Sequence, residues 1–218
     1  MTDEFITYNE SLYGKYLREL KAGVAFGIIA SLILFVLAAT VVVMNFVFIK
    51  VKVSGSSMYP TLKNGDVVTV NVYAEPDYGD ILIISGEKKN GDWLIKRAIA
   101  FGGDTVKTEG GYVYLKKSGE QEFTLLDEPY LAEGVITPSV IGYPSDFSER
   151  IFEIAADEIF YLGDNRTNSS DSRSEYGACS KDQIIGTVSE FAVKTKSVNG
   201  FFEGISQTIT GLFGRKPA

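Results

Sequence analysis

The sequence of 218 residues contains no histidine and one cysteine, Cys179. Without an imidazole, the chain cannot form a Ser-His-Asp triad, a Cys-His dyad or a histidine-ligated zinc site. A single thiol forms no internal disulfide and no CxxC metal knuckle, so we expect Cys179 to be a packed or surface residue. The formal net charge of −7 argues against nucleic acid as a partner, because nucleic acid requires a basic surface.

Charge is also absent from one long segment, which runs from Ala22 to Ile49. A helix of this length exceeds the roughly 30 Å hydrocarbon core of a bilayer. The apolar region of a cleavable signal peptide is shorter, about 7–15 residues. We therefore predict a single N-terminal transmembrane helix over residues 22–49, with a buried soluble helix as the alternative. Three basic residues lie near each end of this segment, so placing residues 1–21 as a cytoplasmic tail is an expectation that the positive-inside rule does not decide.

Residues 50–198 form the predicted folded domain, which contains short β-rich runs separated by Gly, Asp and Asn. No long segment of helical periodicity lies between these runs, so the pattern predicts a mainly β domain with an antiparallel, barrel-like sheet. The expected strands are Val67–Tyr73, Ile81–Ser85, Trp93–Phe101, Tyr112–Lys116, Ile159–Leu162 and Ile184–Val193.

Two further segments differ in composition from these strands. Residues 118–157 contain three prolines and mixed polarity, and we interpret them as an insertion or a long excursion. Residues 199–218 form an amphipathic or flexible C-terminal tail with apolar side chains at helical spacing. An interfacial helix on a bilayer, a helix packed on the domain and a frayed terminus all fit this tail.

A hydrolase without imidazole needs a hydroxyl nucleophile activated by lysine, a carboxylate pair or an oxygen-ligated metal. The segment SGSSMYPTL, residues 54–62, follows the apolar run and offers serines among small residues. Glycine and serine permit close approach of the backbone, and a serine presents both its hydroxyl and its N–H to a bound carbonyl. Taken alone, the same segment is also typical of a juxtamembrane linker.

Lys96 lies within the apolar run Trp93–Phe101, on the strand face shared with Leu94 and Ala98. Apolar surroundings disfavour the charged ammonium and would lower the pKa of Lys96 from about 10.4, which supplies neutral amine near pH 8. Such an amine can accept a proton from serine. The alternative is that Lys96 and Arg97 form a solvated strand end.

A third cluster, GDNRTNSSDSR at residues 163–173, follows the expected strand Ile159–Leu162. It is rich in turn formers, hydroxyl groups and opposite charges, and we expect a loop pinned by Asp–Arg pairs. Two features argue against EF-hand calcium binding: the arginines repel a cation, and the glycine and glutamate are at the wrong positions. The charged residues with this structural role are Asp164, Arg166, Asp171 and Arg173.

Taken together, these segments resemble the bacterial type I signal peptidases in their single-span form, over about residues 20–195. The matching blocks are SGSSMYPTL, Gly65–Val70, Lys96-Arg97 with Gly103-Asp104, and GDNRTNSSDSR. The resemblance implies that Ser57 is the nucleophile and Lys96 the general base, and that Ser169 orients the lysine. It further implies that Asp171 and Arg173 brace the loop, and it implies no metal and no organic cofactor.

The same resemblance implies a membrane-anchored serine endopeptidase that removes signal peptides from secreted preproteins through an acyl-enzyme. It places the protein in the cell membrane as a single-pass protein, with its catalytic domain outside the cytoplasm, in contact with lipid and near the secretion translocon. Met58 would line a substrate pocket for small side chains. Gly55 departs from members that carry an oxyanion-hole serine two positions before the nucleophile, which leaves the second donor open.

Two other functions fit parts of the pattern. One is a self-cleaving Ser-Lys protease of the repressor type, which the membrane span and the lack of a DNA-binding segment disfavour. The other is a non-catalytic, membrane-tethered β-domain that binds protein partners.

Overall fold

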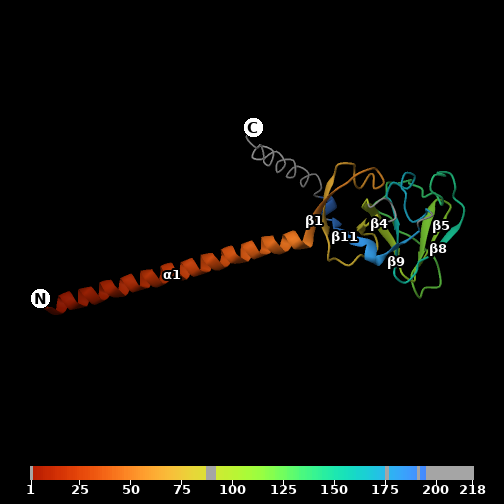
Figure 1. Ribbon diagram of the computed structural model, residues 1–218. Helices are drawn as coiled ribbons and strands as arrows, with labels where there is room; N and C mark the ends of the chain where they lie inside the picture. Colours follow the sequence, from red (N-terminus) through yellow and green to blue (C-terminus); the bar gives the residue numbers. More distant parts are fainter. Residues whose placement is uncertain (1, 87–91, 175–176, 191, 195–218) are drawn as a thin grey trace, which may run out of the picture. The chain divides into compact units, whose positions relative to one another are not determined.

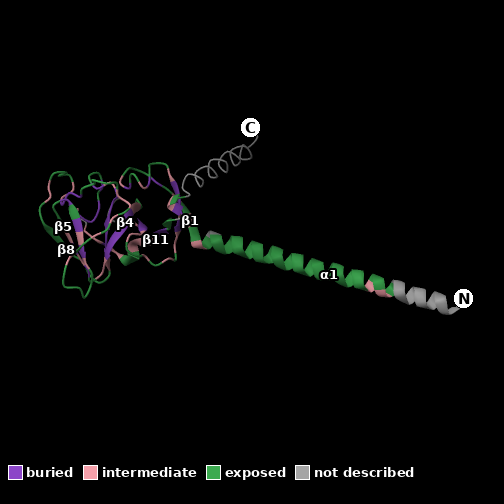
Figure 2. Ribbon diagram, turned by 180° about the vertical axis from the view of Figure 1, so that it is seen from behind, coloured by how far each residue is buried: buried purple, intermediate pink, exposed green. Residues whose placement is uncertain are grey.

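The computed structural model describes residues 2–86, 92–174, 177–190 and 192–194, and the chain divides into two units, Met1–Val47 and Phe48–Ala218. The first unit is the helix α1 (Thr2–Val47). Every residue from Arg18 to Met44 is exposed (Figure 2). By length and composition, the segment Tyr13–Met44 is able to cross a membrane.

The helix differs from the expected span at both ends. It already includes the residues from Thr2 onward, so the described part of the predicted tail 1–21 is helical. It ends at Val47, two residues before Ile49, because Phe48 begins a strand, β1 (Phe48–Lys52). That strand pairs with the strand β2 (Val67–Asn71) over five residues, from Phe48 opposite Asn71 to Lys52 opposite Val67.

The second unit is built from antiparallel strands in two sheets, which confirms the predicted mainly β class (Figure 1). The seven-stranded sheet has the order β1-β2-β11-β3-β4-β9-β10, and the four-stranded sheet has the order β7-β6-β5-β8. The remaining elements are β3 (Ile81–Ile84), β4 (Leu94–Phe101), β5 (Thr105–Glu109), β6 (Tyr112–Lys116), β7 (Thr124–Leu125), β8 (Arg150–Glu153), β9 (Glu158–Leu162), β10 (Cys179–Ser180), the 3-10 helix η1 (Lys181–Gln183) and β11 (Ile184–Val188).

The centre of the large sheet is covered on both faces. All four residues of β3 are buried, because alternate side chains enter different core clusters. Ile81 and Ile83 pack with Met58 in one cluster, and Leu82 packs with Tyr161 in another. This double cover makes β3 and its neighbour β4 a rigid platform for side chains that project from them.

The small sheet begins with a hairpin in which β5 and β6 are joined by Gly110 and Gly111. Both glycines have positive φ, 60° and 88°, as a tight hairpin turn requires. The excursion 118–157 supplies the two outer strands, β7 and β8. These two strands of the excursion are therefore part of the small sheet.

Other strand limits agree with the sequence-based expectation to different degrees. Tyr112–Lys116 forms a strand with these limits, whereas the expected strand Ile184–Val193 is wrong beyond Val188, and residues 192–194 are helical. The strands β1, β5, β7, β8 and β10 were not expected. The predicted tail 199–218 lies outside the described residues.

Candidate active site

The segment of residues 54–62 presents Ser57 between β1 and β2. Its neighbour Met58 and, further on, Leu62 are buried and pack against Val68 and Val70 of β2. The Leu62 N–H also donates to the Met58 carbonyl at 2.8 Å. These anchors fix the backbone around Ser57, while Ser57 itself remains partly exposed.

Lys96 reaches this serine from β4, an interior strand that pairs with β3 and β9. The lysine is only 4% exposed. Its Nζ lies 2.7 Å from the Ser57 Oγ and 3.0 Å from the Ile95 carbonyl oxygen. The two residues that the sequence singled out, 39 positions apart, therefore share a hydrogen bond.

Ser57 and Lys96 line the same pocket, which has a volume of about 480 Å³. Its lining residues are Val51, Lys52, Val53, Ser54, Gly55, Ser57, Met58, Asp92, Trp93, Leu94, Ile95 and Lys96. The expected pocket residue Met58 is among them. The pocket joins the nucleophile segment, β1 and the start of β4, so it offers a groove beside the hydroxyl group.

Gly55 also lines this pocket and has a positive φ of 91°, a conformation that favours glycine. Its N–H donates to the Asn64 Oδ1 at 3.0 Å. The hydroxyl of Ser56 accepts a hydrogen bond from the Asn168 Nδ2 at 3.2 Å. Both groups next to the nucleophile therefore already have protein partners.

The loop of residues 163–173, which follows β9, holds the backbone of the nucleophile segment. The Asn165 N–H donates to the Ser57 carbonyl at 2.9 Å, and its Nδ2 donates to the Ser56 carbonyl at 3.0 Å. Sequence analysis did not assign this role to Asn165 or Asn168. Their presence in a turn-rich cluster was a signal, but it did not indicate what they would bind.

Gly163 lies close to both Ser169 and the nucleophile segment. A Cβ at this position would lie 2.1 Å from the Ser169 Oγ and 2.5 Å from the Ser57 carbonyl oxygen, so only glycine fits. Ser169 is buried, and its Oγ has no hydrogen-bond partner among the described residues. The expected bond from Ser169 to Lys96 is not seen, and the orienting role of Ser169 stays a prediction.

Asp171 and Arg173 form an ion pair and further hydrogen bonds that hold the loop 163–173. The Arg173 Nε and Nη2 donate to the two Asp171 carboxylate oxygens, each at 2.8 Å. Asp171 accepts from the Gly163 N–H at 3.1 Å, and Arg173 Nη1 donates to the Pro138 carbonyl at 2.7 Å. The pair thus ties the loop to itself and to the excursion 118–157.

The other two charged loop residues pair with groups outside the loop, which the sequence did not indicate. Asp164 accepts two hydrogen bonds from Arg97, at 2.8 and 2.6 Å, and one from the Thr61 hydroxyl at 2.6 Å. Arg166 donates to Glu128. Both pairs are buried, so the loop is anchored to β4 and to the excursion.

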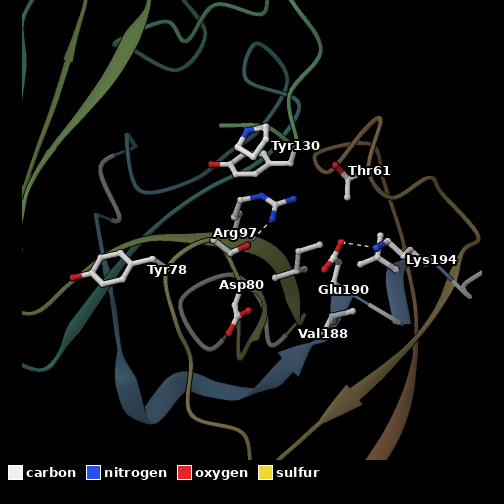
Figure 3. Close-up of a pocket in the computed structure, with 12 residues that line it drawn as sticks. Thr61, Tyr78, Asp80, Arg97, Tyr130, Val188, Glu190 and Lys194 are labelled. Carbon is white, nitrogen blue, oxygen red and sulfur yellow. Dashed lines mark hydrogen bonds and ion pairs between the residues drawn. The ribbon is translucent and has the colours of Figure 1, made fainter. Parts of the chain in front are cut away.

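A second pocket, of about 560 Å³, lies where Arg97 and Tyr130 meet the residues after β11 (Figure 3). Neither Ser57 nor Lys96 lines it. In this pocket the Tyr130 ring lies over the Arg97 guanidinium, 3.6 Å from its carbon atom to the ring centroid.

Comparisons with known proteins give a family match and several similar relatives. A family model described as signal peptidase, peptidase S26, matches residues 26–192. The chain is 34% identical over 165 residues to signal peptidase I S of Bacillus subtilis (strain 168), covering 72% of this chain and 84% of the relative. It is 34% identical over 168 residues to signal peptidase I U of the same strain, covering 74% and 84%. A crystal structure of a signal peptidase I from Enterococcus faecalis V583 is 21% identical, with a TM-score of 0.39 and coverage of 53% and 98%.

Proposed function

This chain belongs to the signal peptidase family, peptidase S26, and on that premise we propose that Ser57 is its nucleophile and Lys96 its general base. The protein is a membrane-anchored peptidase that cleaves signal peptides. The observation that carries the residue assignment is the 2.7 Å distance between the Lys96 Nζ and the Ser57 Oγ in a pocket. Nothing in the family assignment favours a non-catalytic tethered domain.

The reaction begins when the neutral Lys96 amine accepts the hydroxyl proton of Ser57. The Ser57 oxygen then bonds to the carbonyl carbon of the scissile peptide, and the tetrahedral intermediate collapses as the C–N bond breaks. Lys96 gives its proton to the leaving amine. Water, deprotonated by Lys96, next hydrolyses the ester on Ser57 and restores the enzyme. Burial of Lys96 favours the neutral amine that both steps need, because it disfavours a charged ammonium.

The carbonyl oxygen of the substrate needs hydrogen-bond donors when it becomes negative. The Ser57 N–H is the first donor in this proposal. The Gly55 N–H serves as a second donor only if substrate displaces its bond to the exposed Asn64 side chain. Met58 and the apolar residues beside it form the floor of the pocket for the small side chains that precede the cleavage site.

We further propose a single-pass orientation with the catalytic unit outside the cytoplasm, where secreted preproteins emerge. Ser57 follows the helix end at Val47 by ten positions, so its tether is at most about 35 Å long. A cleavage site just past an apolar signal segment lies within this reach of the bilayer. The partners are preproteins with signal peptides, together with membrane lipid and a neighbouring translocon.

Cleavage of a synthetic signal peptide by the full chain in detergent tests the residue assignment. Ser57→Ala and Lys96→Ala should each abolish cleavage, with the cut position determined by mass. Ser148→Ala and Lys116→Ala alter the same residue types away from the pocket and should cleave at the wild-type rate. Unaltered cleavage by Ser57→Ala or Lys96→Ala would refute the assignment.

The pH dependence gives a second readout of the same assignment. The rate should rise from pH 5 toward pH 9 as the buried amine loses its proton. A rate that stays flat over this range would contradict lysine as the base.

A further inference from the structure

Residues 128–130 of the excursion contact two arginines that the proposed mechanism does not use. The Glu128 carboxylate accepts from the Arg166 Nη2 at 2.5 Å and from its Nη1 at 3.1 Å. The Tyr130 hydroxyl donates to the same carboxylate at 2.8 Å. The Tyr130 ring covers the Arg97 guanidinium, as the close-up shows (Figure 3). One short segment therefore contacts both arginines.

Both arginines hold the start of the loop 163–173. The Arg166 Nε donates to the Gly163 carbonyl at 3.0 Å, and Arg97 donates twice to Asp164. The next residue, Asn165, donates its N–H to the Ser57 carbonyl at 2.9 Å. Three consecutive loop residues thus connect the two arginines to the backbone of the nucleophile.

Because these contacts are buried, losing one of the two charges is costly. The Arg166 side chain is fully buried, and the Glu128 side chain is 13% exposed. A buried guanidinium without its carboxylate is costly, so the position of Arg166 depends on Glu128. Burial, together with the Glu128 charge, raises the pKa of Tyr130, which keeps its hydroxyl protonated as a donor to Glu128.

We propose that Glu128 and Tyr130 are positioning residues for signal-peptide cleavage: they hold Arg166 and Arg97, and through them the loop that fixes Ser57 beside Lys96. This inference rests on the proposed function of Ser57 and Lys96. Neither Glu128 nor Tyr130 lines the pocket that contains these two residues. Their loss should therefore lower kcat and leave KM nearly unchanged.

The test measures kcat and KM for the full chain in detergent with a synthetic signal peptide, well below the melting temperature of each variant. For Glu128→Gln, kcat should fall about 10²-fold, as expected for a small displacement of reacting groups. Tyr130→Phe keeps the ring over Arg97 and loses only the hydroxyl, so kcat should fall less. Glu109→Gln breaks an exposed ion pair on the small sheet and serves as the matched control, with kcat unchanged.

A double variant separates positioning from general stabilisation. Glu128→Gln combined with Arg166→Met removes both buried charges, so it should recover most of the melting temperature that Glu128→Gln loses. Arg166→Met also removes the Nε that donates to the Gly163 carbonyl. The loop therefore lacks this hydrogen bond in the double variant, and kcat should stay low. Recovery of kcat together with the melting temperature would overturn the positioning role.

Two other results would also overturn it: wild-type kcat in Glu128→Gln, or a loss that appears in KM alone. Should Glu128→Gln fail to fold, Tyr130→Phe and the double variant still decide between these outcomes. Ser57→Ala, measured in parallel, distinguishes a failure of the proposed function from a failure of the positioning role alone. If Ser57→Ala still cleaves, the proposed function fails; if it is inactive while Glu128→Gln keeps its kcat, only this inference fails.

Discussion

The loop 163–173 and the outer face of the four-stranded sheet contain the same kinds of charged residues in opposite environments. Around the loop, the Arg97–Asp164 pair has side-chain exposures of 8% and 0%, and the Arg173–Asp171 pair 1% and 0%. On the sheet, the Lys107–Glu109 pair has exposures of 18% and 48%. The two regions therefore separate the effect of an ion pair from the effect of its burial.

The difference lies in what each charge fixes. Around the loop, every guanidinium nitrogen of Arg97 and Arg173 donates a hydrogen bond, and the acceptors include the Gly79 and Pro138 carbonyls, which lie outside the loop. On the sheet, Lys107 contacts Glu109, Glu149 and the Tyr114 ring, and both carboxylates are exposed. Exposed pairs contribute little to stability, whereas breaking a buried pair leaves a charge without solvent. We therefore expect the buried ion pairs to hold the loop 163–173 in one geometry, whereas the exposed pair on the small sheet constrains its side chains less.

Removing a carboxylate from each region should give the largest contrast. Asp164→Asn leaves the buried Arg97 without a compensating charge, so the free energy of unfolding should fall by about 3–5 kcal/mol. Cleavage should fall at least about 10²-fold, because the loop that holds Ser57 loses its link to β4. Glu109→Gln is the counterpart on the sheet and should change neither property measurably. Denaturant unfolding in detergent and the peptide assay measure both effects.

Equal losses of stability in Asp164→Asn and Glu109→Gln would show that burial does not distinguish the two regions. High salt provides a further control, because it screens the exposed pair and leaves the buried pair nearly unaffected.

A glycine substitution in each region should give the next largest effect. In Gly163→Ala the added Cβ would lie 2.1 Å from the Ser169 Oγ and 2.5 Å from the Ser57 carbonyl, so the backbone must move. We expect a loss of about 2–3 kcal/mol, as for overpacking, and a large fall in kcat. Gly110→Ala, in the β5–β6 hairpin, has a φ of 60° and no atom within 4 Å of the new Cβ. It should cost about 1 kcal/mol through backbone strain alone, with kcat unchanged.

Comparable kcat values for these two alanine variants, measured with the same peptide, would contradict the close packing of the loop on the nucleophile. The comparison holds the mutation constant and varies only its surroundings.

The sequence indicated the kind of chemistry better than it indicated which charged side chains form pairs. Lys96 could be singled out because a lysine in an apolar run is unusual locally. Ser57 was chosen among the serines of residues 54–62 only through the resemblance to the signal peptidases, because this segment alone is also typical of a linker. Asp164 and Arg97 are 67 positions apart, and Arg166 and Glu128 are 38 apart. Such pairs depend on strand register and on the path of the excursion, which no local pattern encodes.

The missed strands have a similar cause. Phe48 and Ile49, the first two residues of β1, continue the apolar run of α1, so composition alone does not separate the helix end from a strand. What defines β1 is its partner β2, which lies beyond the whole segment 54–62. The strands β7 and β8 are short, and pairing with β6 and β5 defines them.

The smallest expected difference between the two regions concerns how buried and exposed tyrosines affect stability at alkaline pH. Burial, followed by the nearby Cys179 and Asp171, raises the pKa of Tyr161 to about 12. Because the proton is bound more tightly in the folded state, this stabilisation is complete below about pH 10 and is lost as the pH rises toward 12. As the pH rises from 9 to 11, the titration of Tyr161 should therefore lower the free energy of unfolding by about 1.4 kcal/mol.

The measurement compares denaturant unfolding of the wild type and Tyr161→Phe at pH 9 and pH 11. The alkaline loss of stability should be smaller in Tyr161→Phe, because the buried phenol that resists ionisation is gone. Tyr112→Phe alters an exposed tyrosine of the small sheet and should keep the wild-type loss. Identical alkaline losses in all three proteins would mean that Tyr161, on the strand that leads into the loop, is in contact with water. The buried surroundings of the loop would then not extend along β9.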